Sequence, residues 1–224
     1  MVQQYSTLFI VATPIGNLKD ITLRALEVLA AVDVIACEDT RRTRILLQHY
    51  KIEKPLVSYH AYSKLQRTEY LLQALRDGRT VAVVSDAGTP GISDPGVALI
   101  AAALQAGARV EAIPGATAFV PALVVSGKPA HQFIFEGFLP VKPGARRRAL
   151  SVLKSQHRTV VFYESSHRLR ACLQDVADIF GENHPIVVAR ELTKKFEEVR
   201  REPATAMVKH FRDTPPRGEF VVVV

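Results

Sequence analysis

Short apolar runs alternate with amphipathic stretches along the first half of the chain. The runs have the length of buried strands and lie at 7–12, 32–36, 55–58, 80–85 and 109–113. The stretches between them have helical periodicity and cover 22–31, 40–50, 63–76 and 95–106. Strands and helices that alternate with short links predict a parallel, three-layer α/β sheet over residues 1–114.

The pattern restarts after Gly127 and predicts a second α/β domain with a mixed sheet over residues 115–224. Its expected strands lie at 133–136, 159–163, 185–189, 196–201 and 219–224, the last two antiparallel. A basic helix from about Ala145 and a helix that ends at Phe180 are expected between them. The chain stops on an apolar strand, which we interpret as a shortened version of a longer protein.

The loop at 85–96 combines three glycines, two prolines and two carboxylates directly after a buried strand. Glycine and proline at this density set unusual backbone angles and let a ligand approach the main chain closely. Ligands of open α/β sheets bind at the carboxyl ends of the strands. Asp86 is therefore a binding candidate, with helix capping as its alternative role, although Asp94 is better placed before Pro95 to cap the next helix.

Two other strand exits carry polar groups. The exit at 13–17 has one glycine and lacks the GxGxxG spacing of a dinucleotide site, which argues against a nicotinamide cofactor. The exit at 37–43 gathers two acids, two hydroxyls and two guanidinium groups. One interpretation is that these side chains bind a ligand. The other is that Asp39 or Thr40 caps the following helix and that Arg41 and Arg42 face solvent.

Composition narrows the class of protein. The 224 residues carry 29 Lys and Arg against 22 Asp and Glu, a formal charge of +7, with the positive residues in clusters that could face phosphates. Cys37 and Cys172 lie far apart without metal-ligand spacing, so we expect reduced packing residues and no metal. The absence of a leader and of an apolar run of about 20 residues predicts a cytoplasmic protein.

Several stretches together resemble a known family: VATPIGNL (11–18), ACEDTRRT (36–43), SDAGTPGISDPG (85–96), IPG (113–115), EGFLP (136–140), FYES (162–165), HR (167–168) and ARELTKKFEE (189–198). They are similar to the bacterial ribosomal small-subunit methyltransferase I branch of the tetrapyrrole (corrin/porphyrin) methylase superfamily, over essentially the whole chain. Two positions depart from the family pattern. Ala116 and Thr117 replace the usual Pro-Ser, and Ser166 stands where Pro is common.

The resemblance implies an S-adenosylmethionine-dependent enzyme that methylates the ribose 2′-hydroxyl of a cytidine in small-subunit (16S) ribosomal RNA. It implies two α/β domains with the cofactor in a cleft between them, a homodimer, and a small helical C-terminal segment that this chain lacks. The implied cofactor residues are Pro14, Ile15, Asp86, Gly88, Thr89, Thr117, Ala118, Phe138 and Leu139. A carboxylate such as Asp86 suits the ammonium group of the cofactor's methionine part.

A ribose hydroxyl is a weak acid, so a protein group must take or polarise its proton. The strand exits offer Glu164, Asp39 and His167 as acceptors, with Lys194 helping to lower the pKa of the hydroxyl. A purely structural role remains open for each. Phosphate contacts are expected from Arg41, Arg42, Arg146, Arg147, Arg148, Arg190 and Lys195.

Two other functions remain open at this stage. A tetrapyrrole-type small-molecule methylase would share fold and cofactor, but the basic clusters and the lack of Trp count against it. A non-catalytic RNA-binding module would no longer bind the cofactor, which calorimetry can test. The residues do not say which nucleotide is modified, or whether free RNA or an assembled subunit is the substrate.

Overall fold

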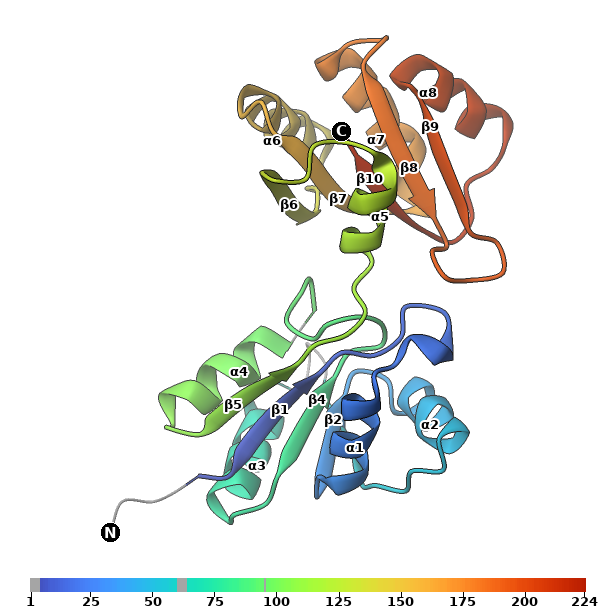
Figure 1. The fold of residues 1–224 in the computed structure, drawn as a ribbon. Helices are drawn as coiled ribbons and strands as arrows, with labels where there is room; N and C mark the ends of the chain where they lie inside the picture. The colour runs from blue at the N-terminus through green and yellow to red at the C-terminus, as the bar shows by residue number, and fades with distance from the viewer. Residues whose placement is uncertain (1–4, 60–63, 95) are drawn as a thin grey trace. The chain divides into compact units, whose positions relative to one another are not determined.

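The computed structural model describes residues 5–59, 64–94 and 96–224 and divides into two compact units, residues 1–117 and 118–224 (Figure 1). Two predicted helix starts, at Ser63 and at Pro95, lie outside the described residues. Each unit contains one sheet with helices packed on it.

The first unit contains a five-stranded sheet in which every pairing is parallel. The strand order is β3-β2-β4-β1-β5. The strands are β1 (Thr7–Val11), β2 (Val34–Cys37), β3 (Leu56–Ser58), β4 (Val81–Val84) and β5 (Arg109–Ile113). The predicted parallel sheet is confirmed, and its carboxyl ends, with the loops that follow them, all lie on one edge.

Helices cover both faces of this sheet. One face packs on α1 (Leu23–Ala31) and α2 (Thr40–His49), the other on α3 (Lys64–Arg76) and α4 (Gly96–Gln105). Leu29 and Leu99 are completely buried in these two cores, so truncating either to Ala should cost about 2–5 kcal/mol. At the start of α1, Leu23 is 79% exposed, and Ala25 is the residue that faces the core.

Side-chain hydrogen bonds cap the starts of two of these helices. Thr22 caps α1: its Oγ1 accepts a hydrogen bond from the Ala25 N–H at 3.1 Å. Asp39, and not Thr40, caps α2: its Oδ1 accepts from the Arg41 N–H at 2.8 Å. The first four N–H groups of a helix have no intrahelical partner, which is why oxygen-bearing side chains are favoured there.

The second unit contains a mixed five-stranded sheet, as predicted, with the order β6-β7-β10-β8-β9. Its strands are β6 (Phe133–Phe138), β7 (Thr159–Ser165), β8 (Pro185–Arg190), β9 (Glu198–Pro203) and β10 (Glu219–Val223). β6 and β7 pair in parallel, and the other pairings are antiparallel. The ends of β6, β7 and β8 therefore lie at the same edge as the start of β10.

Three helices cover one face of this second sheet: α6 (Pro143–Ser155), α7 (Ser166–Phe180) and α8 (Ala204–Asp213). The short helix α5 (Phe119–Ser126) packs on the other face. The sequence patterns did not predict α8, whose inward residues Ala204, Met207 and Phe211 lie at helical spacing. No helix in the described ranges is long and apolar enough to cross a membrane.

Candidate functional site

Main-chain contacts in the first unit join the exits of three adjacent strands, β4, β1 and β5. Thr13 and Gly88 form an antiparallel bridge, with N···O distances of 2.9 and 3.0 Å. The Thr13 hydroxyl also donates to the Ser85 carbonyl at 3.0 Å, and the Thr89 hydroxyl donates to the Ala116 carbonyl at 3.1 Å. These bonds hold the three exit loops in one arrangement.

Two glycines allow the loops to come this close. Gly88 has φ +85°, a conformation that residues with a Cβ rarely adopt. A Cβ at Gly115 would lie 2.8 Å from the Cβ of Ala12. The expected cofactor residues of the first unit gather around these contacts, with Ile15 and the main chain of Thr117 both within 4 Å of a Cβ placed at Gly88. They are Pro14, Ile15, Gly88, Thr89 and Thr117.

The Asp86 side chain reaches from the same β4 exit to the exit of β2. Its Oδ1 accepts a hydrogen bond from the Asp39 N–H at 3.0 Å, and its Oδ2 lies 3.6 Å from Nη1 of Arg42. The capping role goes to Asp94, whose Oδ1 accepts from the N–H groups of Gly91 at 2.7 Å and Gly96 at 2.8 Å. Asp86 is therefore not the cap of α4.

Glu38, which the sequence analysis did not single out, is a carboxyl group with altered acidity at the β2 exit. Burial raises its pKa to about 7, and the negative charges of Asp94 and Asp86 add to the effect. Glu38 and Asp94 line the same small hollow beside Cys37 and Tyr59. The acidic EDT sequence after β2 is visible in the sequence, but only the fold brings Asp86 and Asp94 close to Glu38.

The pKa of Asp39, a predicted proton acceptor, is shifted in the opposite direction. Hydrogen bonds from the side chain and main chain of Arg41 lower its pKa to about 2. A carboxylate that holds protons so weakly is a poor general base near neutral pH. Its observed contacts make it the cap of α2 and a partner of Arg41, at 2.7 Å from Oδ2 to Nη2.

Candidate residues of the second unit meet at the sheet edge where β6, β7 and β8 end. Phe138 pairs with Tyr163 in the sheet register, Ser165 with Glu219, and Arg190 with Phe220. His167 follows in the first turn of α7 and is exposed. The pairing thus brings four separate motifs of the sequence to one place.

Glu164, the other predicted proton acceptor, does not reach solvent at this edge. It is 2% exposed, its Oε1 accepts from the Ser165 N–H at 2.8 Å, and the same oxygen lies 3.3 Å from Nε of Arg168. Alternation along β7 directs it, like Val160 and Phe162, toward the helix-covered face. Its burial corrects our expectation, because a ribose hydroxyl cannot reach it.

Two expected cofactor residues of the second unit lie in different environments. The Phe138 side chain is 53% exposed, with its ring centroid 5.6 Å from that of Tyr163. The Leu139 side chain is 1% exposed and belongs to the core under α6 and α7. Leu139 as a whole residue is buried and its carbonyl accepts from Arg168, so we no longer expect it to contact a ligand directly. Ala118, the last of the expected set, is half-buried before α5.

The loop between β8 and β9 is strained and tightly bonded. Glu191 and Thr193 both have positive φ, 49° and 68°, and such strain clusters at functional sites. Nζ of Lys194 lies 2.9 Å from Oε1 of Glu191 and 2.7 Å from Oε2 of Glu219. Burial works to lower the pKa of Lys194, but these two hydrogen bonds raise it, so the lysine stays charged.

The predicted phosphate-binding residues differ in how far they are buried or paired with carboxylates. Arg146 is 4% exposed, and its Nε and Nη2 both lie 2.7 Å from Oδ2 of Asp175. This buried pair corrects the expectation that Arg146 contacts RNA. Nη1 of Arg147 bridges Asp175 and Asp178 at 2.7 Å each. Besides Arg147, which is exposed but paired, the exposed members of the set are Arg41, Arg42, Arg148 and Lys195. Arg190 is half-buried, with its Nε donating to the Arg217 carbonyl at 2.7 Å.

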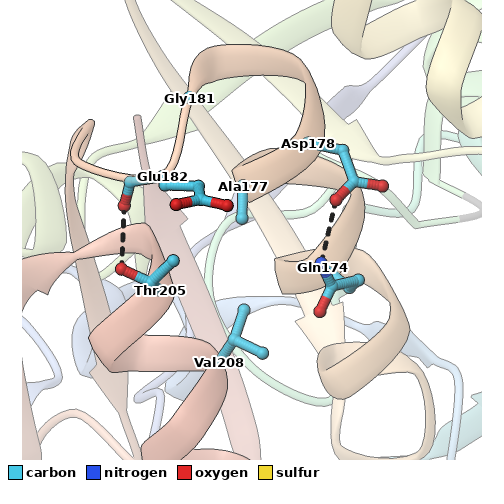
Figure 2. A pocket seen from close by; sticks show the side chains of 7 residues that line it. All are labelled: Gln174, Ala177, Asp178, Gly181, Glu182, Thr205 and Val208. Atoms are coloured by element: carbon cyan, nitrogen blue, oxygen red, sulfur yellow. Dashed lines mark hydrogen bonds between the residues drawn. The ribbon is translucent and has the colours of Figure 1, made fainter.

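A separate hollow of about 240 Å³ lies between α7 and α8 (Figure 2). In it the Gln174 amide donates to Asp178 at 2.8 Å, and the Thr205 hydroxyl donates to the Glu182 carbonyl at 3.1 Å. Its lining contains no predicted site residue, so it is not part of the candidate site. Within the ranges that the structure covers, no group of three His, Cys, Asp or Glu side chains could hold a metal ion.

Comparison with known proteins defines the class. The family described as Tetrapyrrole (Corrin/Porphyrin) Methylases matches residues 7–207. The fold is similar to uroporphyrin-III C-methyltransferase from Thermus thermophilus complexed with S-adenosyl homocysteine, with a TM-score of 0.68, 17% identity, and coverage of 97% of this chain and 96% of that one. The chain thus has the architecture of a methylase of this superfamily.

Two curated relatives narrow the assignment. The chain is 51% identical over 220 residues to ribosomal RNA small subunit methyltransferase I of Xylella fastidiosa, covering 97% of this chain and 81% of the relative. It is 48% identical over 217 residues to the protein of that name from Synechocystis, covering 97% and 78%. Within the tetrapyrrole methylases, the chain belongs to the ribosomal RNA small subunit methyltransferase I family.

Proposed function

We propose that this chain transfers a methyl group from S-adenosylmethionine to the ribose 2′-hydroxyl of a cytidine in small-subunit ribosomal RNA. The observation that carries the proposal is near-complete coverage, at about half identity, by relatives named for methylating this RNA. The cofactor supplies an electrophilic methyl group. The protein's part is to orient it and the hydroxyl in line at about 3 Å.

The residues of the first unit fit such a cofactor. The buried bridge between Thr13 and Gly88 joins the exits of β1 and β4 next to the apolar side chain of Ile15, and the neighbouring Ala87 and Thr89 reach the surface. Adenine and a thioether chain favour apolar walls and main-chain hydrogen bonds, and an ammonium group favours a carboxylate such as Asp86. Phe138, exposed at the end of β6, is the cofactor residue that we propose in the second unit, with the buried Leu139 supporting it.

In this proposal Glu38 accepts the proton of the hydroxyl. It lies at a strand exit next to the Asp86 loop and is half-buried, and its pKa of about 7 suits proton transfer at neutral pH. Asp39 and Glu164 are less suitable, the first because of its low pKa and the second because of its burial. His167 is exposed and remains the alternative acceptor.

The exposed basic residues serve the RNA. Arg41, Arg42, Arg148 and Lys195 would bind backbone phosphates, which makes binding steeply dependent on salt. A cytidine in folded RNA must swing out to reach the site, at a cost of a few kcal/mol. We also propose that the enzyme is a cytoplasmic homodimer, which sedimentation at several protein concentrations would test.

The decisive experiment is transfer of a labelled methyl group to ribosomal particles that lack the modification, followed by nucleoside analysis. Label on a 2′-O-methylcytidine is expected. Label on a base, or none on RNA despite cofactor binding, would contradict the assignment, and a labelled tetrapyrrole would favour the small-molecule alternative. Calorimetry that detects no binding of S-adenosylmethionine would favour a non-catalytic RNA-binding module.

A further inference from the structure

We infer that Glu164 and Arg168 form a positioning pair that holds the main chain of residues 138–140 and so places Phe138 for contact with S-adenosylmethionine. The inference rests on the proposed function and deepens it. Glu164 was a candidate for the chemistry, and Arg168 was noted only as part of a motif. Neither side chain needs to touch the cofactor for this role.

The Arg168 guanidinium holds two successive carbonyl groups. Its Nη2 donates to the Leu139 carbonyl at 2.6 Å and to the Pro140 carbonyl at 3.3 Å. These carbonyls follow β6 directly, at the point where the chain leaves the sheet and has no strand partner. Hydrogen bonds from a charged donor are roughly twice as strong as neutral ones, so this contact fixes the segment firmly.

Glu164 fixes the arginine in turn. The carboxylate is fully buried, and its Oε1 lies 3.3 Å from Nε of Arg168, whose side chain is 22% exposed. Oε2 of Glu164 is buried and has no hydrogen-bond partner among the described residues. Nε of Arg168 also forms no hydrogen bond to any of them, so the 3.3 Å contact is an interaction between charges. A buried charge is costly unless it is paired, and the contact therefore favours one orientation of Arg168.

The backbone just before Phe138 has two features that set the direction of its side chain. The register of β6 against β7 shifts between Phe135 and Phe138, and Gly137 within the shift has φ +67°. A β-bulge of this kind turns a side chain to a new direction and is common beside active sites. Phe138, the last residue of β6, is half-exposed. The next side chain, that of Leu139, is buried in the core. Releasing the two carbonyls from Arg168 would therefore free the phenyl ring and the main chain beside it.

The chain offers a matched control for a test. Arg170, two residues along α7, also binds two successive carbonyls: its Nε donates to Phe211 at 2.6 Å and its Nη2 to Arg212 at 3.2 Å. Those carbonyls lie at the end of α8 and do not belong to the segment after β6. R168A and R170A therefore remove the same kind of contact, and only R168A releases the segment that places Phe138.

Calorimetry with S-adenosylmethionine on the full chain should show about tenfold weaker binding for R168A, partial rescue by R168K, and unchanged affinity for R170A. Thermal unfolding should show similar losses of stability for R168A and R170A. Unchanged affinity in folded R168A, or equal weakening by both variants, would overturn the inference. If the unmodified chain binds no cofactor, the proposed function fails instead.

E164Q separates positioning from proton transfer. For a positioning residue, the variant weakens cofactor binding and raises KM for the cofactor, while the pH profile of kcat keeps its shape. For a proton acceptor, kcat would fall by about 10²-fold or more with cofactor affinity intact, and that result would overturn the inference. The double variant E164Q/R168A should bind no more weakly than R168A alone, because both changes release the same segment.

Discussion

The main-chain N–H of Asp39 donates a hydrogen bond to Oδ1 of Asp86 across 3.0 Å. The bond joins the exits of two adjacent strands, β2 and β4, and places the Asp86 carboxylate between the proposed cofactor site and the start of α2. Asp86 therefore has two separable properties, a negative charge and a hydrogen-bond acceptor.

Replacing Asp86 with Asn should separate these properties. D86N keeps an oxygen for the Asp39 N–H and removes the charge, so S-adenosylmethionine should bind about tenfold more weakly with little change in melting temperature. Calorimetry measures the affinity. Unchanged binding would show that Asp86 does not face the ammonium group.

D33N is the control for D86N. Asp33 lies at the other end of the same strand pair, where its Oδ2 accepts from the Thr80 N–H at 2.7 Å. The change removes the same charge from the same two strands, far from the exits. D33N should leave cofactor affinity unchanged.

Methyl transfer should depend on the protonation of Glu38. With a pKa of about 7, the carboxyl loses its proton as pH rises through neutrality, so kcat should increase and level off above that point. E38Q should lower kcat by about 10²-fold or more and remove this limb of the profile. A profile that E38Q leaves intact would move the acceptor role to His167.

Glu38 should also affect stability. Its pKa is 4.5 in the unfolded reference and about 7 in the folded chain, so the folded state retains the proton over this range and the unfolded state loses it. The free energy of unfolding should therefore fall as pH rises from 4.5 to 7. Urea unfolding of E38Q should show a smaller fall over the same range.

Arg146 should matter for stability. R146A leaves Asp175 buried with only Arg147 as its partner, and breaking a buried ion pair costs about 3–5 kcal/mol. Urea unfolding should show a loss of this size. A loss below about 1 kcal/mol would indicate that Arg147 and solvent compensate.

Arg148 should matter for RNA. It is exposed on α6, two residues from the buried Arg146, so R148A should leave stability within about 0.5 kcal/mol of the original chain. RNA binding should weaken, and the slope of log affinity against log salt should fall by about one. An unchanged salt slope would exclude Arg148 from the RNA contact, and cofactor affinity should not change.

Local patterns were enough to predict most strands, the parallel and mixed sheets, and the family. The apolar runs that became β1 to β5 needed only burial and short links, and motifs such as SDAGTPGISDPG are specific enough to identify the family. The cap of α2 was predicted as an alternative, because Asp39 and Thr40 are both good cap residues. The helix at 204–213 was not predicted, although Ala204, Met207 and Phe211 lie at helical spacing.

The roles of individual charged residues depended on tertiary contacts. Alternation along β7 buries Glu164 on the helix-covered face, Asp175 draws Arg146 into the core, and Arg41 makes Asp39 a weak base. Glu38 became a candidate only when the fold brought Asp86 and Asp94 near it. The acidity and reach of a side chain depend on burial and on charges distant in sequence, whereas a strand or a motif is set by neighbours along the chain.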